Sequence, residues 1–585
     1  MGEEIKRIRI NRLSSESNVF DEILFHDGIN LILGEKYDES STRGRKTNGV
    51  GKSMSIEFLD FCFLCDYDKS RISKIPDEVL DPEENIILEM EIGGEAITIK
   101  RNRKKQDKPI IIRNGKVTQF DKLQDAKDYI TELLFENLNG KEVPTFRTLL
   151  SVLIRDERSE FTDILKCHDL SKRIPDDLTS HLFMLGLSLE AYKQVIATIK
   201  EIDKTTTALN KVKNELTQNG GKKIADIKAE MNALEAELSQ MGEALDAFRS
   251  NDAFSSMEAE LVELENMLDQ LRQRQKILKR EYEKIRLLPQ PEQVDDTEIE
   301  LVYNQFKSNL GNAVVKSLNE VVDFKNKVEE FQRILVNQKA RDLEKQIAEI
   351  SEQIRVLDEQ YAEKIKIIDT KGVLKNLKTS LKVYEVKKET SAHTHFLFEQ
   401  YNQYDKQQKL LRVKKSQELL EIDAEIDELI DELKSFTATI LDIHEAIMAN
   451  KECSFEIKTK NTPRGKTPVD INLRIYDDGS HSVNRTKVFI YDMALMFNEY
   501  TRKRHPLFLV HDNIFDVDQD TLVQCLNYVY QQEEHYSDFQ YILTLNRDKI
   551  ENEERTKLIK MNIDEHKRAV FTKVKKFLKR DYQEK

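Results

Sequence analysis

A glycine-rich run that ends in lysine and serine is the part of this chain best suited to chemistry. It reads Asn48-Gly49-Val50-Gly51-Lys52-Ser53, follows the apolar, strand-like residues 28–34, and leads into a helix-like segment from Met54. Glycines before a helix let backbone N–H groups approach an anion, a lysine can reach the β- and γ-phosphates of a nucleotide, and a serine can hold Mg²⁺. The pattern therefore predicts a phosphate-binding loop for ATP and Mg²⁺.

This loop departs from the strict pattern, which places a glycine five residues before Gly51, where this chain has Lys46. The missing glycine is displaced to Gly34, and a polar insert over residues 36–47 separates it from Asn48. Such an insert predicts a surface loop. A chance match in a turn is the alternative. The flanking strand and helix favour nucleotide binding by Gly34 and by the residues from Asn48 to Ser53.

A second candidate for metal binding lies near the other end of the chain. Four apolar residues, 507–510, are followed by His511, Asp512 and Asn513. A buried parallel strand that ends in aspartate delivers a carboxylate to the C-terminal edge of its sheet, where ligands bind. Paired with the phosphate loop, this pattern predicts Ser53 and Asp512 as the two Mg²⁺ ligands.

Both ends of the chain are predicted to be globular. Alternating and apolar runs bounded by Gly-Gly and Asn-Gly turns favour strands. They cover residues 85–92, 95–100, 109–113 and 469–476, and a helix is predicted over 486–501.

The composition favours long helices over ordinary globular packing, because 585 residues include only 18 Gly and 10 Pro while 34% are charged. The net charge of −14 restricts nucleic-acid contact to local basic patches. The basic loop residues Arg101, Arg103, Lys104 and Lys105 are candidates for binding the DNA backbone, as is the run over 573–580, although both also suit a solvated surface. Five cysteines and no apolar run of bilayer length predict a cytoplasmic protein without membrane contact.

Three segments of the middle of the chain carry apolar residues at alternating three- and four-residue steps. They run over 261–285, 343–361 and 419–447, with charged residues between the apolar positions. Such narrow stripes predict coiled-coil arms, although amphipathic helices of a compact bundle are the alternative. Clear breaks fall only at Asn219-Gly220-Gly221 and around Pro289.

These segments predict an antiparallel hairpin between two globular lobes. Its parts are an N-terminal lobe over residues 1–187, an outgoing arm over 188–286, an apex over 287–324, a returning arm over 325–450 and a C-terminal lobe over 451–585. Further breaks are expected near 370–372 and 390–393, which would give the returning arm a joint.

The order of phosphate loop, arm, apex, returning arm and aspartate-terminated strand resembles the SMC superfamily of coiled-coil ABC ATPases. The resemblance implies an α+β, ABC-type ATPase head that is assembled from both lobes, with a long antiparallel coiled-coil arm. It also implies a homodimer in which two heads enclose two ATP molecules.

Several positions depart from the pattern of that family. The signature loop would fall over residues 478–485, where Ser480, Ser482, Asn484 and Arg485 are the candidates for a contact with the γ-phosphate across a dimer. The catalytic glutamate expected after Asp512 is replaced by Asn513, which cannot accept a proton. Slow basal hydrolysis is therefore expected, with Asp512 and Asn513 as the catalytic positions and Asp516 or Asp518 as further carboxylates.

Two more family positions differ as well. The switch histidine is absent, and Asn546 is the nearest polar residue to its position. The glutamine of the loop after the first lobe would lie in the segment 153–158, which contains no glutamine.

This combination of changes resembles a divergent bacterial group of SMC-like proteins in anti-phage and anti-plasmid defence, closest to the SMC-like subunit of Lamassu systems. The resemblance implies double-stranded DNA, an effector nuclease and a small accessory subunit as partners. Two alternatives stay open. One is a RecN-like ATPase of DNA repair or chromosome organisation, and the other is a nucleotide-gated scaffold with little turnover.

Overall fold

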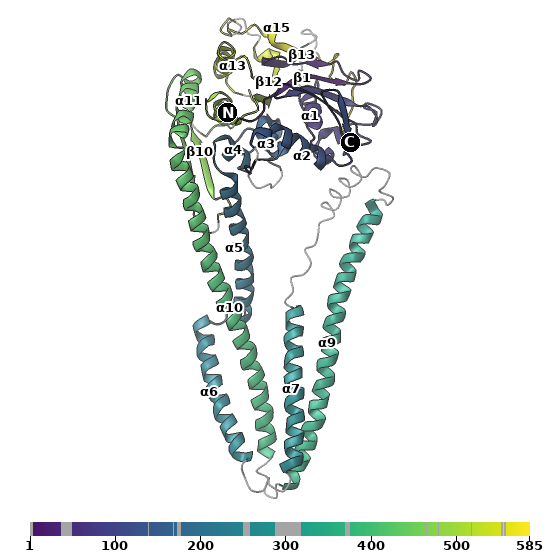
Figure 1. Ribbon diagram of the computed structural model, residues 1–585, viewed down its shortest axis with the longest axis vertical. Helices are drawn as coiled ribbons and strands as arrows, with labels where there is room; N and C mark the ends of the chain where they lie inside the picture. Colours follow the sequence, from purple (N-terminus) through teal and green to yellow (C-terminus); the bar gives the residue numbers. More distant parts are fainter. Residues whose placement is uncertain are drawn as a thin grey trace. The chain divides into compact units, whose positions relative to one another are not determined.

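The computed structural model describes residues 4–36, 49–138, 140–167, 169–171, 177–249, 258–286, 318–368, 375–463, 465–477, 479–515, 517–550, 554 and 557–584 (Figure 1). These residues form two compact units. The first contains the described residues up to Ala197 and from Lys415 onward, and the second contains those from Thr198 to Lys414.

A five-stranded parallel sheet forms the centre of the first unit, with strand order β13-β3-β12-β11-β8. The strands are β3 (Gly28–Gly34), β8 (Ile154–Arg155), β11 (Phe508–Asp512), β12 (Gln540–Asn546) and β13 (Lys567–Phe571). Every residue of β3, β11 and β12 is buried, as expected for strands covered on both faces. This sheet combines strands from both ends of the chain, with β3 lying between β13 and β12, so neither end can complete it alone.

A six-stranded antiparallel sheet accompanies it, with strand order β2-β1-β4-β5-β6-β7. The strands are β1 (Ile8–Ser15), β2 (Ile23–Leu24), β4 (Ile86–Ile92), β5 (Glu95–Arg101), β6 (Ile110–Arg113) and β7 (Lys116–Gln119). Burial alternates along β4, which is typical of a sheet with one face on the core. A separate hairpin pairs β9 (Ser454–Thr459) with β10 (Val469–Arg474).

The helices of the first unit include α1 (Lys52–Cys62), α2 (Leu123–Leu134), α3 (Phe146–Leu153), α4 (Thr179–Met184), α11 (Ile430–Met448), α12 (His481–Phe497), α13 (Gln519–Glu533) and α15 (Ile563–His566). The helix α12 begins five residues before the predicted start, because the Ser480 hydroxyl caps it by accepting a hydrogen bond from the Val483 N–H at 3.2 Å.

The apolar stripe of α11 belongs to the globular unit, although the sequence assigns it to the returning arm. Phe436, Ile440 and Ile443 are buried, and α11 contacts α12 and α13. Apolar residues at three- and four-residue steps pack equally well against a globular core and against a partner helix. The pattern therefore could not distinguish a core helix from a coiled-coil helix.

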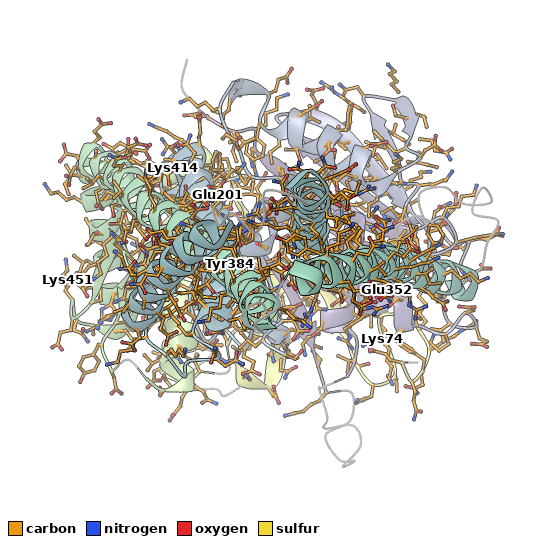
Figure 2. All side chains as sticks on the ribbon, turned by 90° about the horizontal axis from the view of Figure 1, so that it is seen from below. Lys74, Glu201, Glu352, Tyr384, Lys414 and Lys451 are labelled. Atoms are coloured by element: carbon orange, nitrogen blue, oxygen red, sulfur yellow. The ribbon has the colours of Figure 1, made fainter. Side chains whose placement is uncertain are left out.

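The second unit consists of long helices. They are α5 (Leu189–Leu216), which starts in the first unit, α6 (Ile224–Arg249), α7 (Glu258–Arg286), α9 (Leu318–Ile368) and α10 (Lys375–Glu428), which ends in the first unit. Charged side chains such as Glu201, Glu352 and Lys414 project from these helices into solvent (Figure 2). Among the described helices, none has the length and apolar content needed to span a bilayer.

An antiparallel pairing joins α7 to α9. Arg272 contacts Asp358 at 3.1 Å and Gln275 donates to Ser351 at 2.7 Å, so residue numbers rise on one helix as they fall on the other. Leu268 is buried in the seam between the two helices. In the same unit α10 pairs with α6, since Lys387 forms an ion pair with Glu237. The helix α7 also contacts α10.

The expected break over residues 390–393 is wrong, because α10 runs through it without interruption. The hydroxyls of Thr390 and Thr394 donate to carbonyls four residues earlier, at 2.8 and 2.9 Å, so these side chains are accommodated within the helix. The predicted break at Asn219-Gly220-Gly221 separates α5 from α6. The other expected break, at 370–372, and most of the expected apex lie outside the described residues.

Candidate nucleotide-binding site

The phosphate loop leads from β3 into the N-terminus of α1. Gly49 and Gly51 have φ values of 70° and 110°, a region that residues with a Cβ rarely adopt. No side chain caps α1 at Gly51, so the first N–H groups of the helix can donate hydrogen bonds to an anion. Gly34 ends β3, and Asn48 lies outside the described residues.

Lys52 is buried at the first position of α1, with an exposed fraction of 7%. Its ammonium group donates a hydrogen bond to Oδ1 of Asn546, the last residue of β12. Burial lowers the pKa of Lys52, whereas Asp512 and Glu157 act to raise it. Asn546 thus contacts the cation that the sequence assigns to the phosphates.

Asp512 ends the adjacent strand, β11, and is 2% exposed. Its carboxylate accepts a hydrogen bond from the Thr544 hydroxyl at 2.5 Å and another from the Ser53 hydroxyl. Burial raises the pKa of Asp512 to about 6. A serine hydroxyl and a carboxylate in contact supply the oxygen ligands that Mg²⁺ prefers, so these residues fit that ion.

Asn513 and Glu157 face each other across the ends of two neighbouring strands. β8 pairs with β11 through Ile154 and Val510, and Glu157 follows β8 by two residues. The Asn513 amide donates a hydrogen bond to Oε1 of Glu157. Asn513 has a φ of 62°, which asparagine tolerates better than most residues. Sequence reasoning marked only the surrounding segment and missed the position of this carboxylate.

A cavity of about 450 Å³ opens at this edge of the sheet. It is lined by Gly49 to Met54, Arg71, Glu157 and Asn513, and by seven residues of the C-terminal tail, Lys576, Phe577, Leu578, Arg580, Asp581, Tyr582 and Glu584. The sequence predicts the loop residues here but not the tail.

The tail, defined here as residues 572–584, packs directly on the phosphate loop. The Phe577 N–H donates to the Val50 carbonyl at 3.1 Å, and the Phe577 ring lies 4.5 Å from that of Phe20. A Cβ at Gly51 would lie 2.5 Å from the Phe577 Cβ, so the close approach needs a glycine there. Glu584 accepts a hydrogen bond from Arg71 at 3.1 Å. The basic run over 573–580 therefore contributes to the wall of the cavity.

The signature-like residues do not line the described cavity themselves, although Arg485 contacts the backbone of Asn513, which does. Arg485 donates to the carbonyls of Asn513 and Ile514 at 2.9 and 3.3 Å, and its guanidinium lies over the Phe161 ring. The Ser480 hydroxyl caps α12. None of the side chains of Ser480, Ser482, Asn484 and Arg485 lines the cavity as the structure describes it, and their contact across a dimer stays a prediction.

Two of the four candidate DNA-binding residues are internal. Arg101 is 1% exposed, donates to the Cys65 carbonyl at 2.9 Å and lies over the Phe61 ring. Arg103 is 9% exposed and donates to the Leu80 carbonyl at 2.7 Å. The prediction of a phosphate-binding surface is wrong for both, because alternation along the chain buries them. Lys104 and Lys105 are exposed and remain candidates.

A buried polar network lies beneath the site. Asp492 of α12 contacts Nε of Arg155 at 2.7 Å and Nε2 of His511 at 3.0 Å. Tyr541 of β12 contacts Nδ1 of His511 at 3.1 Å. Arg155 and Asp492 are no more than 1% exposed, and each is charge-compensated by the other. The network ties β8, β11 and β12 to α12.

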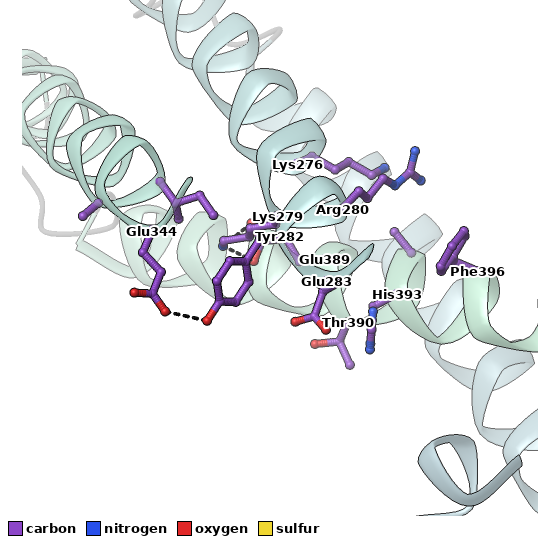
Figure 3. A pocket seen from close by; sticks show the side chains of 13 residues that line it. Lys276, Lys279, Arg280, Tyr282, Glu283, Glu344, Glu389, Thr390, His393 and Phe396 are labelled. Atoms are coloured by element: carbon purple, nitrogen blue, oxygen red, sulfur yellow. Dashed lines mark hydrogen bonds and ion pairs between the residues drawn. The ribbon is translucent and has the colours of Figure 1, made fainter. Parts of the chain in front are cut away.

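A second cavity, of about 570 Å³, lies between α7, α9 and α10 (Figure 3). Lys279 forms an ion pair with Glu389 at 3.1 Å, and the Tyr282 hydroxyl donates to Glu344 at 2.5 Å. Lys279 and Glu389 therefore compensate each other's charge within the cavity. No helix N-terminus is among the residues that line it, so it differs in kind from the first cavity.

The chain matches one family profile and is similar to solved structures. The profile of a family described as an uncharacterised protein conserved in bacteria (DUF2326) matches residues 443–580. That segment includes β11, with Asp512, and most of the tail. No curated protein matches the chain.

Two solved structures resemble it over most of its length. The Smc head domain with a coiled coil and joint from Pyrococcus yayanosii is 13% identical, with 92% of each chain covered and a TM-score of 0.32. The Smc head domain with an extended coiled coil bound to the C-terminal domain of ScpA, from Pyrococcus furiosus, is 9% identical, with 93% of this chain and 90% of that chain covered and a TM-score of 0.30.

Proposed function

We propose that this chain is an SMC-like ATP-binding subunit that hydrolyses ATP slowly and acts as a homodimer through ATP-sandwiched heads. The observation that carries the proposal is that the buried Lys52, at the start of α1, and the buried Asp512 contact the neighbouring strand β12, through Asn546 and Thr544, at the C-terminal edge of one parallel sheet. A phosphate loop, a metal-binding carboxylate and a buried cation at one sheet edge are the parts that phosphoryl transfer requires.

The residues divide the work of binding between them. The N–H groups at the start of α1 and the Lys52 ammonium would hold the phosphates, so Lys52 would exchange its bond to Asn546 for a phosphate oxygen. Ser53 and Asp512 would hold Mg²⁺, which neutralises charge that develops on the phosphates when it is bound. The tail would cover the loop from the Phe577 side.

Substitutions of the two charged residues test nucleotide binding. Lys52→Ala removes the cation and Asp512→Ala removes the metal ligand, and each should abolish ATP-dependent dimerisation while the chain stays folded. Lys74→Ala, an exposed lysine outside the cavity, is the matched control. ATP affinity, dimer mass and circular dichroism measure the outcome, and wild-type ATP affinity in Lys52→Ala would refute the assignment.

We further propose that the subunit senses or clamps double-stranded DNA and controls an effector nuclease, with a small accessory subunit, in an anti-phage or anti-plasmid defence complex. This part rests on the sequence resemblance. DNA affinity should fall steeply with salt, because each neutralised phosphate releases counterions. Charge reversal of Lys104 and Lys105 should weaken binding to DNA of every sequence. A DNA affinity that changes with neither salt nor these substitutions would show that the two lysines do not contact the DNA backbone.

A nucleotide-gated scaffold is the second candidate, and Asn513 favours it because an amide cannot take a proton from water. The two candidates differ in a single measurement, the single-turnover rate of ATP hydrolysis with and without DNA. Turnover that DNA accelerates supports the ATPase, whereas tight ATP binding without turnover supports the scaffold.

A further inference from the structure

We infer that Glu157 is the general base for ATP hydrolysis in this chain, so that the carboxylate and the amide have exchanged sides relative to the arrangement expected from the sequence. The inference rests on the proposed ATPase function. The direct observation is the hydrogen bond from the Asn513 amide to Oε1 of Glu157, within the cavity that the phosphate loop lines.

The position of Glu157 follows from the sheet. It lies beyond the end of β8, which is hydrogen-bonded to β11, so it reaches the same edge as Asp512 and Asn513. It lines the same cavity as Gly49 to Met54 and Asn513, beside the residues proposed to hold the phosphates. Asp512 is proposed to bind Mg²⁺ together with Ser53, so it is not available as the base. Glu157 is then the carboxylate that can act on water.

The other carboxylates described at the cavity have cationic partners. Glu584 is bound to Arg71, and Asp581 contacts Lys576. Glu157 instead accepts a bond from a neutral amide, which leaves its charge uncompensated by that contact. A carboxylate of this kind can both orient a water molecule and accept its proton.

The alternatives named by the sequence are weaker. Asp518 caps α13, since it accepts hydrogen bonds from the Thr521 N–H at 3.0 Å and from the Thr521 hydroxyl at 2.5 Å. It does not line the cavity. Asp516 lies outside the described residues.

The chemical step balances without a further reactant. The water oxygen forms a bond to the γ-phosphorus, and the bond from that phosphorus to the β–γ bridging oxygen breaks. Glu157 takes the water proton, ADP keeps the electron pair of the broken bond, and inorganic phosphate leaves. The protonated Glu157 then returns its proton to phosphate or solvent. Asn513 orients Glu157 through its amide and exchanges no proton.

Four variants test the exchange: Glu157→Gln, Asn513→Glu, the double variant Glu157→Gln/Asn513→Glu, and the control Glu160→Gln, an exposed carboxylate outside the cavity. Glu157→Gln should lower the single-turnover rate by about 10²–10⁴-fold, the usual worth of a general base, with ATP affinity within about twofold of wild type. The ATP-bound dimer should live correspondingly longer. The double variant should recover most of the rate, and Glu160→Gln should match wild type.

The pH dependence of the single-turnover rate is a further measurement, and it would not change if Glu157 had only a structural role. The fall in single-turnover rate at acid pH should be shallower in Glu157→Gln than in wild type and steeper again in the double variant, on top of the fall that protonation of Asp512 contributes in all three proteins. A wild-type rate in Glu157→Gln, a loss that the double variant does not restore, or ATP binding without any turnover in wild type would each overturn the inference. Loss of the contrast in ATP affinity between wild type and Lys52→Ala would instead overturn the proposed function.

Discussion

At the scale of single residues, the site contains two buried ionisable side chains, Lys52 and Asp512. Lys52 and Asp512 are both shifted by burial in the direction that disfavours their charge. Each charge is compensated by the other group and by a neutral partner, Asn546 or Thr544. Groups of this kind give the site a defined shape before a nucleotide arrives, which lowers the cost of ordering it on binding.

His505 should make the first unit sensitive to acid. It is 2% exposed, and its Nδ1 accepts from the Leu507 N–H at 2.9 Å. Its pKa is lowered from 6.5 to about 3, mainly by burial and with a contribution from nearby Arg502, against which Asp492 acts. Because the unfolded histidine binds a proton that the folded one refuses, stability is full above pH 6.5 and falls as the pH drops toward 3. The loss at pH 5 is about 2 kcal/mol.

His505→Asn keeps an acceptor near the Nδ1 position but cannot be protonated, so its Tm should fall less than that of wild type between pH 7 and pH 5. His535→Asn, at an exposed position, should keep the wild-type slope. Part of the slope should remain in His505→Asn, since His181 is also buried with its pKa lowered to about 3. Equal slopes in all three proteins would contradict the assignment, and Tm measured by scanning fluorimetry decides between them.

At the scale of elements, Phe577 anchors the tail beside the phosphate loop with both its ring and its backbone. Phe577 is 1% exposed and packs against Phe20 and Phe58 at ring distances of 4.5 and 5.0 Å. Removing a buried phenylalanine typically costs about 3–5 kcal/mol. The backbone bond from the Phe577 N–H to Val50 does not require the ring, so loss of the side chain should loosen the tail more than the loop.

Phe577→Ala should therefore weaken ATP binding by more than about tenfold and lower the Tm, because a loosened tail no longer supports Gly51 and its neighbours. Val574→Ala is the matched control, since this tail side chain is 71% exposed. Isothermal titration with ATP and a thermal scan measure both effects. An unchanged affinity in a folded Phe577→Ala would show that the tail is only a neighbour of the site.

Local sequence patterns predict some elements of the fold and cannot predict others. The apolar run before the glycines and the run before Asp512 lie on β3 and β11, because strands buried on both faces leave a continuous apolar signal. The strand β8 has only two residues, too few for any periodicity, and it is the element that positions Glu157. The contact between Phe577 and the loop joins segments more than 500 residues apart in sequence, which no local pattern records.

At the scale of the whole molecule, the parallel sheet makes the two ends of the chain depend on each other. The strand β3, from the N-terminal side, lies between β13 and β12, from the C-terminal side. If either end were made alone, the buried backbone groups of its strands would lack their partners. The pieces should therefore be soluble only together.

Fragments test this dependence directly. Residues 1–286 and 318–585, produced separately, should aggregate, and produced together they should co-purify in equal amounts. Asp492→Ala in the second fragment should reduce the yield, because removing one partner of a buried ion pair typically costs about 3–5 kcal/mol. The matched control is Asp520→Ala, at an exposed position. Soluble, monomeric fragments made alone would contradict the shared sheet, and size-exclusion chromatography distinguishes the outcomes.

The ion pair of Arg155 and Asp492 also has an evolutionary consequence. Its members come from opposite ends of the chain and are almost completely buried, so a lineage cannot easily lose one charge while it keeps the other. Divergence should pass through paired replacements, in which both positions become apolar or both change together. Positions 155 and 492 should therefore covary among related chains. Such covariation would indicate that the two ends of the chain have stayed in contact throughout divergence.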